Sequence, residues 1–159
     1  MRIDLTESEF RILNFVGTMR YHITSSACPE QLQDKTQNPL DVVVNGVIGE
    51  YIVAKALGLF FDLNCDLRNW GEDLKTKNGK TIDVKATWKK GGNLNCRLSK
   101  KWKSSDFYIL VELDDDGGDV IGWIKKANLF NEQNVIDIGN GPYYSVSQDK
   151  LERKFNVSE

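Results

Sequence analysis

A carboxylate and an amine stand two residues apart in the apolar run Ile82-Asp83-Val84-Lys85. If this run forms a β-strand, Asp83 and Lys85 point to one face of the sheet, while Ile82 and Val84 point to the other. Removing either charge alone from water costs several kcal/mol, so each needs a partner such as a metal ion, a phosphate or the other charge. An exposed ion pair would also satisfy both groups. The chemistry therefore depends on which other carboxylates reach this face.

Either Glu72 or Asp73 can reach the face of Asp83 and Lys85, with Glu72 opposite Lys85 or Asp73 opposite Asp83, and the length of the following turn decides between them. A two-residue turn would make Glu72 the inward carboxylate and would send Asp73 to the other face. A three-residue loop, Lys77-Asn78-Gly79, sets Asp73 directly opposite Asp83. We expect the three-residue loop, because glycine then stands where φ must be positive.

A further carboxylate, Glu50, lies in an expected helix that covers about residues 40–57. Apolar or small residues surround it at three- and four-residue offsets, namely Gly46, Val47, Val53, Ala54 and Leu57. A mid-helix carboxylate gains little from the helix dipole, so Glu50 either extends into solvent or has a function. We predict a function, because the nearby glycines each weaken the helix by about 1 kcal/mol relative to alanine and would let a backbone or ligand approach closely.

The elements that must position these residues form one α/β domain covering residues 1–159. Thr6 and Glu9 have the capping-box pattern and predict a first helix over about residues 7–20. A loop is expected over 22–39, and Gly58 is expected to end the second helix. The periodicity predicts strands at 60–63, 73–76, 81–88, 106–113, 120–124 and 143–146. The segment 97–103 is ambiguous between helix and loop, and the tail from residue 148 is expected to be helical or frayed.

The charge of the chain is unevenly distributed. The net charge is −2, but residues 75–103 hold ten basic side chains and one acidic one, a net +9, which leaves −11 for the remainder. A polyanion could bind the basic segment while the acidic remainder limits unspecific association. A solvated lysine-rich hairpin is the simpler interpretation of the same residues, and the position of Asp83 within them favours the functional one.

Residues 41–130 resemble the PD-(D/E)xK nucleases, the restriction-endonuclease-like superfamily. Glu50 matches the helical glutamate of that family, Asp73 its first strand acid, and Asp83-Val84-Lys85 its second acid, spacer and lysine. The resemblance is to small phage or restriction and repair members. It implies a restriction-endonuclease-like core, with a mixed sheet of about five strands flanked by helices. The residue before Asp73 is a glutamate where many members have proline, which leaves open whether Glu72 or Asp73 is the metal ligand.

The resemblance implies a Mg²⁺-dependent endodeoxyribonuclease, with Mn²⁺ as an expected substitute. Asp73, Asp83 and the backbone carbonyl of Val84 would ligate the metal, and Glu50 would hold a second metal or its water shell. Lys85 would orient the attacking water. The expected DNA-binding residues are Lys89, Lys90, Arg97, Lys100, Lys101 and Lys103. Cleavage directed by DNA structure, as in repair or recombination, is favoured over a long recognition sequence, because little surface remains for base contacts.

Two alternatives remain open at this stage: a nuclease-fold module that binds nucleic acid or protein without cleaving, and a small restriction endonuclease. The sequence does not separate DNA from RNA, endonuclease from exonuclease, or monomer from homodimer. With a single histidine, His22, triads based on histidine are disfavoured. Three widely spaced cysteines and the lack of a signal peptide or apolar span predict a cytoplasmic protein without a membrane partner, in the host cytoplasm if the gene belongs to a phage.

Overall fold

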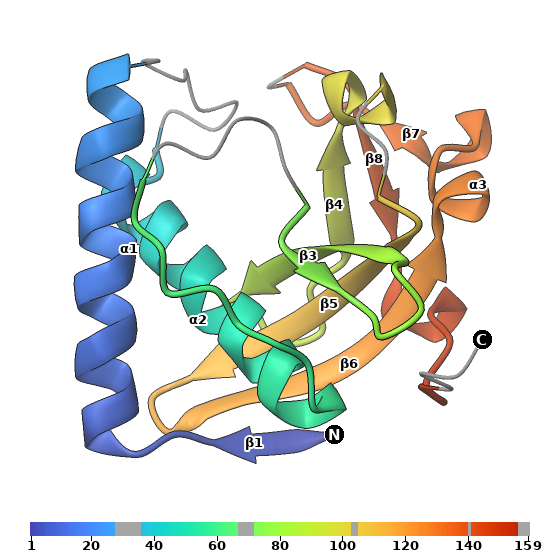
Figure 1. Ribbon diagram of the computed structural model, residues 1–159. Helices are drawn as coiled ribbons and strands as arrows, with labels where there is room; N and C mark the ends of the chain where they lie inside the picture. Colours follow the sequence, from blue (N-terminus) through green and yellow to red (C-terminus); the bar gives the residue numbers. More distant parts are fainter. Residues whose placement is uncertain (28–35, 67–71, 103–104, 140, 156–159) are drawn as a thin grey trace.

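The computed structural model describes residues 1–27, 36–66, 72–102, 105–139 and 141–155. Its centre is a curled five-stranded sheet with the order β1-β6-β5-β3-β2 (Figure 1). The sheet is mixed, because β3 and β5 run parallel while the other neighbouring strands are antiparallel. Its strands are β1 (Arg2–Asp4), β2 (Leu74–Lys75), β3 (Thr81–Thr87), β5 (Phe107–Asp114) and β6 (Gly117–Lys125).

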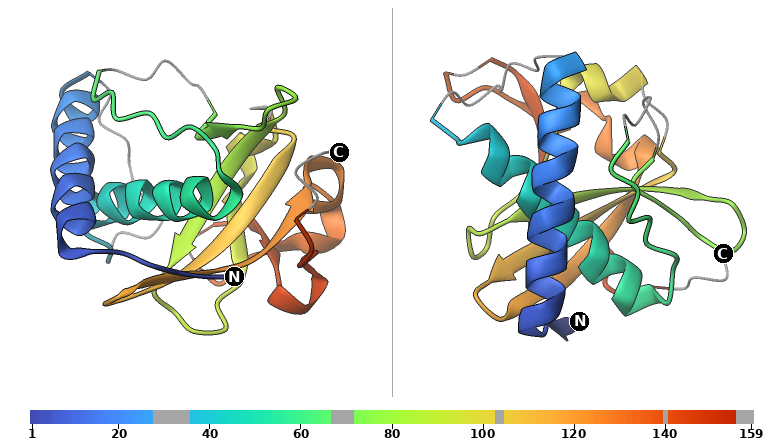
Figure 2. Two further views of the ribbon diagram at one scale, coloured as in Figure 1. Left: turned by 60° about the horizontal axis from the view of Figure 1, so that its bottom comes forward. Right: turned by 60° about the vertical axis from the view of Figure 1, so that its left-hand side comes forward.

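Two helices precede most of this sheet, α1 (Glu7–Ala27) and α2 (Pro39–Leu57). The predicted capping box begins α1: the Glu9 amide donates to Thr6 Oγ1, and the Thr6 amide donates to Glu9 Oε2 at 2.7 Å. The C-terminal end of α2 is also as predicted, because Gly58 adopts the left-handed conformation with φ of 61°. Figure 2 shows α2 lying across the sheet, with α1 crossing α2 on the side away from the strands.

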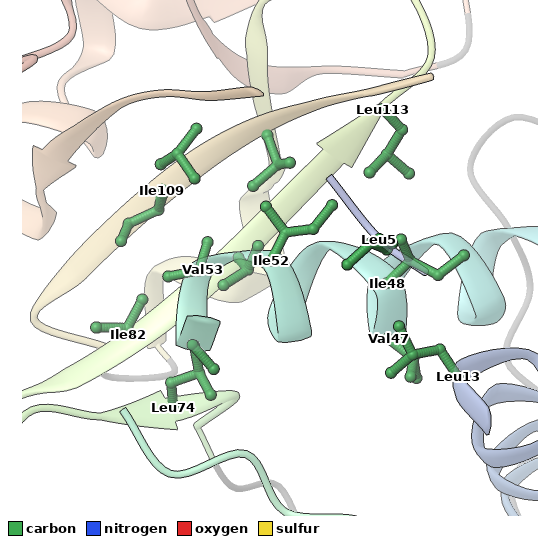
Figure 3. Close-up of a cluster of buried hydrophobic side chains, with 14 of the residues drawn as sticks. Leu5, Leu13, Val47, Ile48, Ile52, Val53, Leu74, Ile82, Ile109 and Leu113 are labelled. Atoms are coloured by element: carbon green, nitrogen blue, oxygen red, sulfur yellow. The ribbon is translucent and has the colours of Figure 1, made fainter. Parts of the chain in front are cut away.

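The larger hydrophobic core lies between α2 and one face of the sheet. Ile52 and Val53 of α2 are fully buried there, and Ile82, Val84 and Ile109 of the strands pack in the same cluster (Figure 3). The alternation expected along residues 81–87 is confirmed, since the even-numbered residues of β3 belong to this core. Their odd-numbered neighbours must therefore point to the opposite face.

A second, three-stranded sheet covers that opposite face. Its order is β4-β8-β7, with β4 (Leu94–Arg97), β7 (Val135–Ile136) and β8 (Tyr143–Val146). Leu94 and Cys96 of β4 pack with Tyr108 and Leu110 of β5 in a separate core cluster. Short helical segments complete the fold: η1 (Leu98–Trp102), α3 (Lys126–Leu129), η2 (Glu132–Asn134) and η3 (Gln148–Lys150).

The hairpin between β2 and β3 has the predicted three-residue loop. The Thr76 amide donates to the Lys80 carbonyl at 2.8 Å, and Gly79 between them has a φ of 78°. Leu74 pairs with Ile82, a register that carries Asp73 to the position opposite Asp83. The choice of turn, and with it the face of Asp73, could therefore be predicted from one glycine.

Three expectations about the elements are wrong: the end of the first helix, the extent of the loop after it, and the strand at 60–63. The helix predicted to end near Arg20 continues to Ala27, because no proline or glycine interrupts it and the Ser26 hydroxyl donates back to the His22 carbonyl at 2.7 Å. The loop predicted over 22–39 is correspondingly shorter, and its residues 28–35 lie outside the described ones. The strands β1, β4 and β7 were not expected from their short and weakly patterned sequences.

The strand predicted at residues 60–63 is absent, and this part of the chain has no regular structure. The Asn64 amide donates to the Asp62 carboxylate at 2.9 Å, and the Asp66 amide donates to the Asn64 side chain at 2.8 Å. Such side-chain bonds bend the backbone locally and compete with a strand ladder. In addition, the carbonyls of Asp62 and Asn64 accept hydrogen bonds from Arg20.

Candidate active site on strand β3

Asp83 and Lys85 lie on the face of β3 that the second sheet covers. Asp83 is buried, with 8% of its surface exposed, and the Lys85 ammonium donates a short hydrogen bond to Asp83 Oδ1. In the parallel ladder with β5, Asp83 pairs with Tyr108 and Lys85 with Leu110. The two charged side chains are therefore set into a mainly apolar layer, as a catalytic pair or a buried ion pair would be.

Asp73 reaches the same place from the neighbouring hairpin strand. Its Oδ2 atom accepts a hydrogen bond of 2.7 Å from the Val84 amide. Burial, followed by the negative charge of Asp83, raises the pKa of Asp73 above its usual range, and the positive charge of Lys85 partly offsets this effect. The fold thus holds Asp73 beside a second carboxylate whose charge opposes the ionisation of Asp73.

Lys85 is the principal cation between these acids. Burial lowers the pKa of Lys85, but the charges of Asp83 and then Asp73 more than reverse this, so the pKa lies above its usual value. Lys85 is therefore an ammonium at neutral pH. A second cation, Lys100 of η1, approaches from the other sheet, with its Nζ atom 3.9 Å from Asp83 Oδ2.

The wall of the site is formed by Tyr108 on β5 and Cys96 on β4, both buried. Burial raises the pKa of the Cys96 thiol to about 11, so this cysteine is neutral at physiological pH. Burial and then the charge of Asp83 raise the pKa of Tyr108. Both groups therefore contribute no charge of their own to the site, and its electrostatics depend on the acids and lysines.

Glu50 has a partner that sequence reasoning did not identify. Its carboxylate accepts a hydrogen bond of 3.0 Å from the Arg20 guanidinium of α1, and both side chains are almost fully buried. Arg20 also stacks on Phe61, 5.7 Å from the ring centroid, and its Nε donates to the Asn64 carbonyl at 3.1 Å. Glu50 thus belongs to a network that joins α1, α2 and the segment after α2.

A signal for Arg20 was present in the sequence. Arg20 continues the buried stripe formed by Leu13 and Val16 at three- and four-residue offsets, so the helical period places its side chain on the apolar face. An arginine on such a face requires an acidic partner or carbonyl groups. By contrast, no sequence signal links Tyr108 or Cys96 to Asp83, because these contacts depend on how the two sheets pack.

The remaining candidate residues differ in their surroundings. Glu72, the alternative metal ligand, forms a salt bridge with Lys75. Gly49 packs so closely on β3 that an added Cβ would lie 2.9 Å from the Cβ of Ala86. Of the expected DNA-binding residues, Lys89, Lys90 and Lys101 are exposed, while Arg97 and Lys100 are partly buried. Lys103 lies outside the described residues.

The donor set of this site suits a small divalent cation that keeps part of its water shell. Asp73 and Asp83 provide hard oxygen donors, and a cation between them would relieve the repulsion that raises the pKa of Asp73. In the described part of the chain, no three acidic, histidine or cysteine side chains are gathered around one point. The two carboxylates are the oxygen ligands that the described side chains bring together here. The Val84 carbonyl, expected as a further ligand, belongs to the backbone of the same strand.

No protein-family model matches the chain, and no curated protein is similar to it. The fold therefore defines a broad class, a mixed α/β protein with a curled five-stranded sheet and helices. Among the described helices, none has both the length and the apolar character needed to span a bilayer.

Proposed function

We propose that this protein is a metal-dependent endodeoxyribonuclease with a restriction-endonuclease-like core, as the resemblance to the PD-(D/E)xK nucleases implies. The observation that carries the proposal is the hairpin register, which holds Asp73 opposite Asp83 with the Lys85 ammonium beside them. A surface ion pair needs only one acid for one lysine. A second acid with a raised pKa, held by the Val84 amide, is better explained by a cation site.

In the proposed reaction Asp73, Asp83 and the Val84 carbonyl would hold Mg²⁺, which when bound would supply positive charge to the phosphate and lower the pKa of water. Lys85 would leave Asp83 and donate a hydrogen bond to the attacking water, which favours the deprotonated nucleophile. The water would lose its proton to solvent and bond to phosphorus, while the bond from phosphorus to the leaving 3′ oxygen breaks. Lys100, whose Nζ atom lies near the other oxygen of Asp83, would bind the scissile phosphate. Glu50 is proposed to act from α2 on a second metal or its water shell, which requires Arg20 to release part of the carboxylate.

The proposed DNA-binding surface follows the basic segment out of the site. Lys89 and Lys90 are exposed directly after β3, next to Trp88, whose surface is 48% exposed. Exposed lysines bind the phosphate backbone, and an exposed indole can stack on an unpaired base. This combination favours branched or single-stranded DNA over a regular duplex as the substrate.

A substrate panel tests this function. The purified protein is incubated with plasmid, branched and single-stranded DNA, and with RNA, in Mg²⁺ or Mn²⁺. We expect cleavage of at least one DNA substrate that is lost in Asp83→Asn and retained in Asp115→Asn, a control aspartate at an exposed position in the turn between β5 and β6. If no substrate is cleaved, or if cleavage persists in Asp83→Asn, the proposal is wrong.

A second candidate function is a nuclease-fold module that binds nucleic acid without cleaving it. The ion pairs of Asp83 with Lys85 and Lys100, together with that of Glu50 with Arg20, favour this alternative, because they neutralise the acids within the protein. Such a module would bind DNA with equal affinity in the wild type and in Asp83→Asn. It would also bind DNA equally with and without Mg²⁺.

A further inference from the structure

The hydroxyl of Tyr108 is the one buried side-chain polar atom in the described residues that has no hydrogen-bond partner of regular geometry. Tyr108 itself is completely buried, with 0% of its surface exposed. The backbone amide of Ser105 lies near the phenol and slightly offsets the raised pKa of Tyr108. An amide can only donate, so the proton of the hydroxyl still has no acceptor.

The packing around the ring does not require this hydroxyl. Tyr108 meets Phe130 edge-to-face at 5.3 Å between ring centroids, and Phe130 meets Tyr144 in the same way at 5.0 Å. A phenylalanine at position 108 would keep these ring contacts. It would also remove an unpaired polar atom that destabilises the fold. Stability alone therefore favours phenylalanine at this position, and the hydroxyl calls for another explanation.

The position of Tyr108 supplies that explanation. Tyr108 pairs with Asp83 in the parallel ladder of β3 and β5, so both side chains point into the layer under β4. In this structure the two oxygens of Asp83 face cations, Oδ1 the Lys85 ammonium and Oδ2 that of Lys100 at 3.9 Å. A carboxylate can accept several hydrogen bonds, and Tyr108 is the uncharged donor beside it.

We propose that Tyr108 is a positioning residue for Asp83: its hydroxyl donates a hydrogen bond to the Asp83 carboxylate when a divalent cation binds and Lys85 turns toward the substrate. The inference rests on the proposed function, because it assigns Asp83 to the cation. The hydrogen bond would fix the orientation of the carboxylate at the moment when Asp83 loses the ammonium of Lys85. Hydrogen bonds to metal ligands commonly orient them in this way, and their loss weakens metal binding by about tenfold or more.

The test compares Tyr108→Phe with Tyr144→Phe, which removes a hydroxyl from the same aromatic cluster but from a strand of the other sheet. Mn²⁺ alone is titrated into the full-length chain and followed by calorimetry or electron paramagnetic resonance, and thermal unfolding is measured in a chelator. We expect the Kd for Mn²⁺ to rise about tenfold in Tyr108→Phe and to stay unchanged in Tyr144→Phe. The Tm of Tyr108→Phe in the chelator should equal or exceed that of the wild type.

Other outcomes overturn the inference. If Tyr108→Phe binds Mn²⁺ like the wild type, the hydroxyl does not position Asp83. If Tyr108→Phe lowers the Tm, or if both variants lose affinity to the same degree, the role is structural. Asp83→Asn separates the inference from the proposed function: if it binds Mn²⁺ as tightly as the wild type, or if the wild type binds none, both are wrong.

Discussion

Three charges on one face of the sheet determine what single residues of this protein can do. Asp73 and Asp83 repel each other, and the Lys85 ammonium compensates for that repulsion when no other cation does so. Loss of one member of such a buried group leaves the other charges without compensation, which destabilises a fold more than loss of a surface ion pair. Lys85 should therefore contribute to stability as well as to the proposed chemistry.

We predict that Lys85→Met lowers the free energy of unfolding at pH 7.5 by about 2 kcal/mol. Without the ammonium, the pKa of Asp73 rises further above its unfolded value. A group whose pKa is raised in the folded state stabilises the fold at low pH, and this stabilisation is lost as pH increases. The difference in free energy of unfolding between Lys85→Met and the wild type should therefore shrink when the pH is lowered from 7.5 to 5. Urea unfolding at both pH values measures this change.

The matched control is Lys75→Met, on the same hairpin. Lys75 is largely exposed and bridges Glu72 at the surface, so its loss should change stability by less than about 0.5 kcal/mol at either pH. Equal effects of the two variants, or a deficit of Lys85→Met that does not depend on pH, would show that the charges of the site do not interact as described.

The residues of the site that could be predicted from the sequence are those that lie close together along the chain. Asp73, Asp83 and Lys85 belong to one hairpin, and a single local rule about Gly79 predicted their common face correctly. The partner of Glu50 lies on another helix, and Tyr108 and Lys100 come from other strands and segments. Such neighbours follow from the packing of whole elements, which sequence spacing does not encode.

At the scale of elements, α2 carries two glycines with opposite surroundings. An added Cβ at Gly46 would meet nothing within 4 Å, whereas one at Gly49 would lie 2.9 Å from the Cβ of Ala86. Gly49 thus allows α2 to approach β3 closely. The sequence predicted a close approach at the glycines, but it did not identify β3 as the partner. Gly46 has no comparable contact.

We predict that Gly46→Ala raises the free energy of unfolding by about 0.5–1 kcal/mol, because alanine favours the helix and fits without contact. Gly49→Ala should lower it by about 1–3 kcal/mol, because the new methyl group pushes α2 away from β3. Chemical denaturation of both variants measures the difference. Equal stabilisation by both substitutions would show that α2 can move away from β3 without a decrease in the free energy of unfolding.

Glu9 joins the beginning of α1 to α2, since its carboxylate accepts hydrogen bonds from the Tyr51 hydroxyl and the Lys55 ammonium, both at 2.7 Å. The hydrogen bond from Lys55 is the largest cause that lowers the pKa of Glu9 to about 2. Because the pKa is lower in the folded than in the unfolded state, Glu9 stabilises the fold at neutral pH, and this contribution disappears as pH falls from about 5 to about 2.

We expect Glu9→Gln to reduce the free energy of unfolding by about 1–2 kcal/mol at pH 7, after allowance for partial solvent screening. The reduction should become smaller as pH falls from about 5 toward 2, because the glutamate of the unfolded chain takes up its proton at a higher pH than folded Glu9 does. Glu7→Gln, at an exposed position on the same turn of α1, serves as the control and should have little effect at any pH. A constant deficit of Glu9→Gln across this range would contradict the lowered pKa.

The elements with strong periodicity were predicted correctly, as were the short strands at 143–146 and 73–76, whereas β1, β4 and β7 were not predicted. The helix near residues 40–57 and the strands at 106–113 and 120–124 carry long apolar patterns, and the structure has them. The strand β4 has only four residues and alternates Leu94 and Cys96 with two polar residues after a pair of glycines. Such a short pattern does not reveal a second sheet, because the pairing with β8 joins residues about fifty positions apart.

For the molecule as a whole, the second sheet converts one face of the first into an enclosed, mainly apolar layer that surrounds the charged side chains of β3. The proposed site lies within this layer, where β4 and η1 bring Cys96 and Lys100 over β3. The exposed lysines after β3 continue from the same region toward the surface. The net charge of −2 therefore conceals a basic surface segment that could bind nucleic acid while the remainder repels it.

We predict that reversing two charges, Lys89→Glu with Lys90→Glu, reduces DNA affinity by about tenfold or more and lowers the slope of log Kd against log salt by about 2. Each exposed lysine that binds a phosphate releases counterions, so the loss of two contacts must reduce the salt dependence as well as the affinity. Fluorescence anisotropy with a labelled branched DNA in a chelator, at several salt concentrations, measures both. The control Arg153→Glu with Lys154→Glu makes the same change in net charge at exposed positions outside the basic segment. If the control weakens binding as strongly and changes the slope equally, net charge rather than the segment after β3 governs DNA binding.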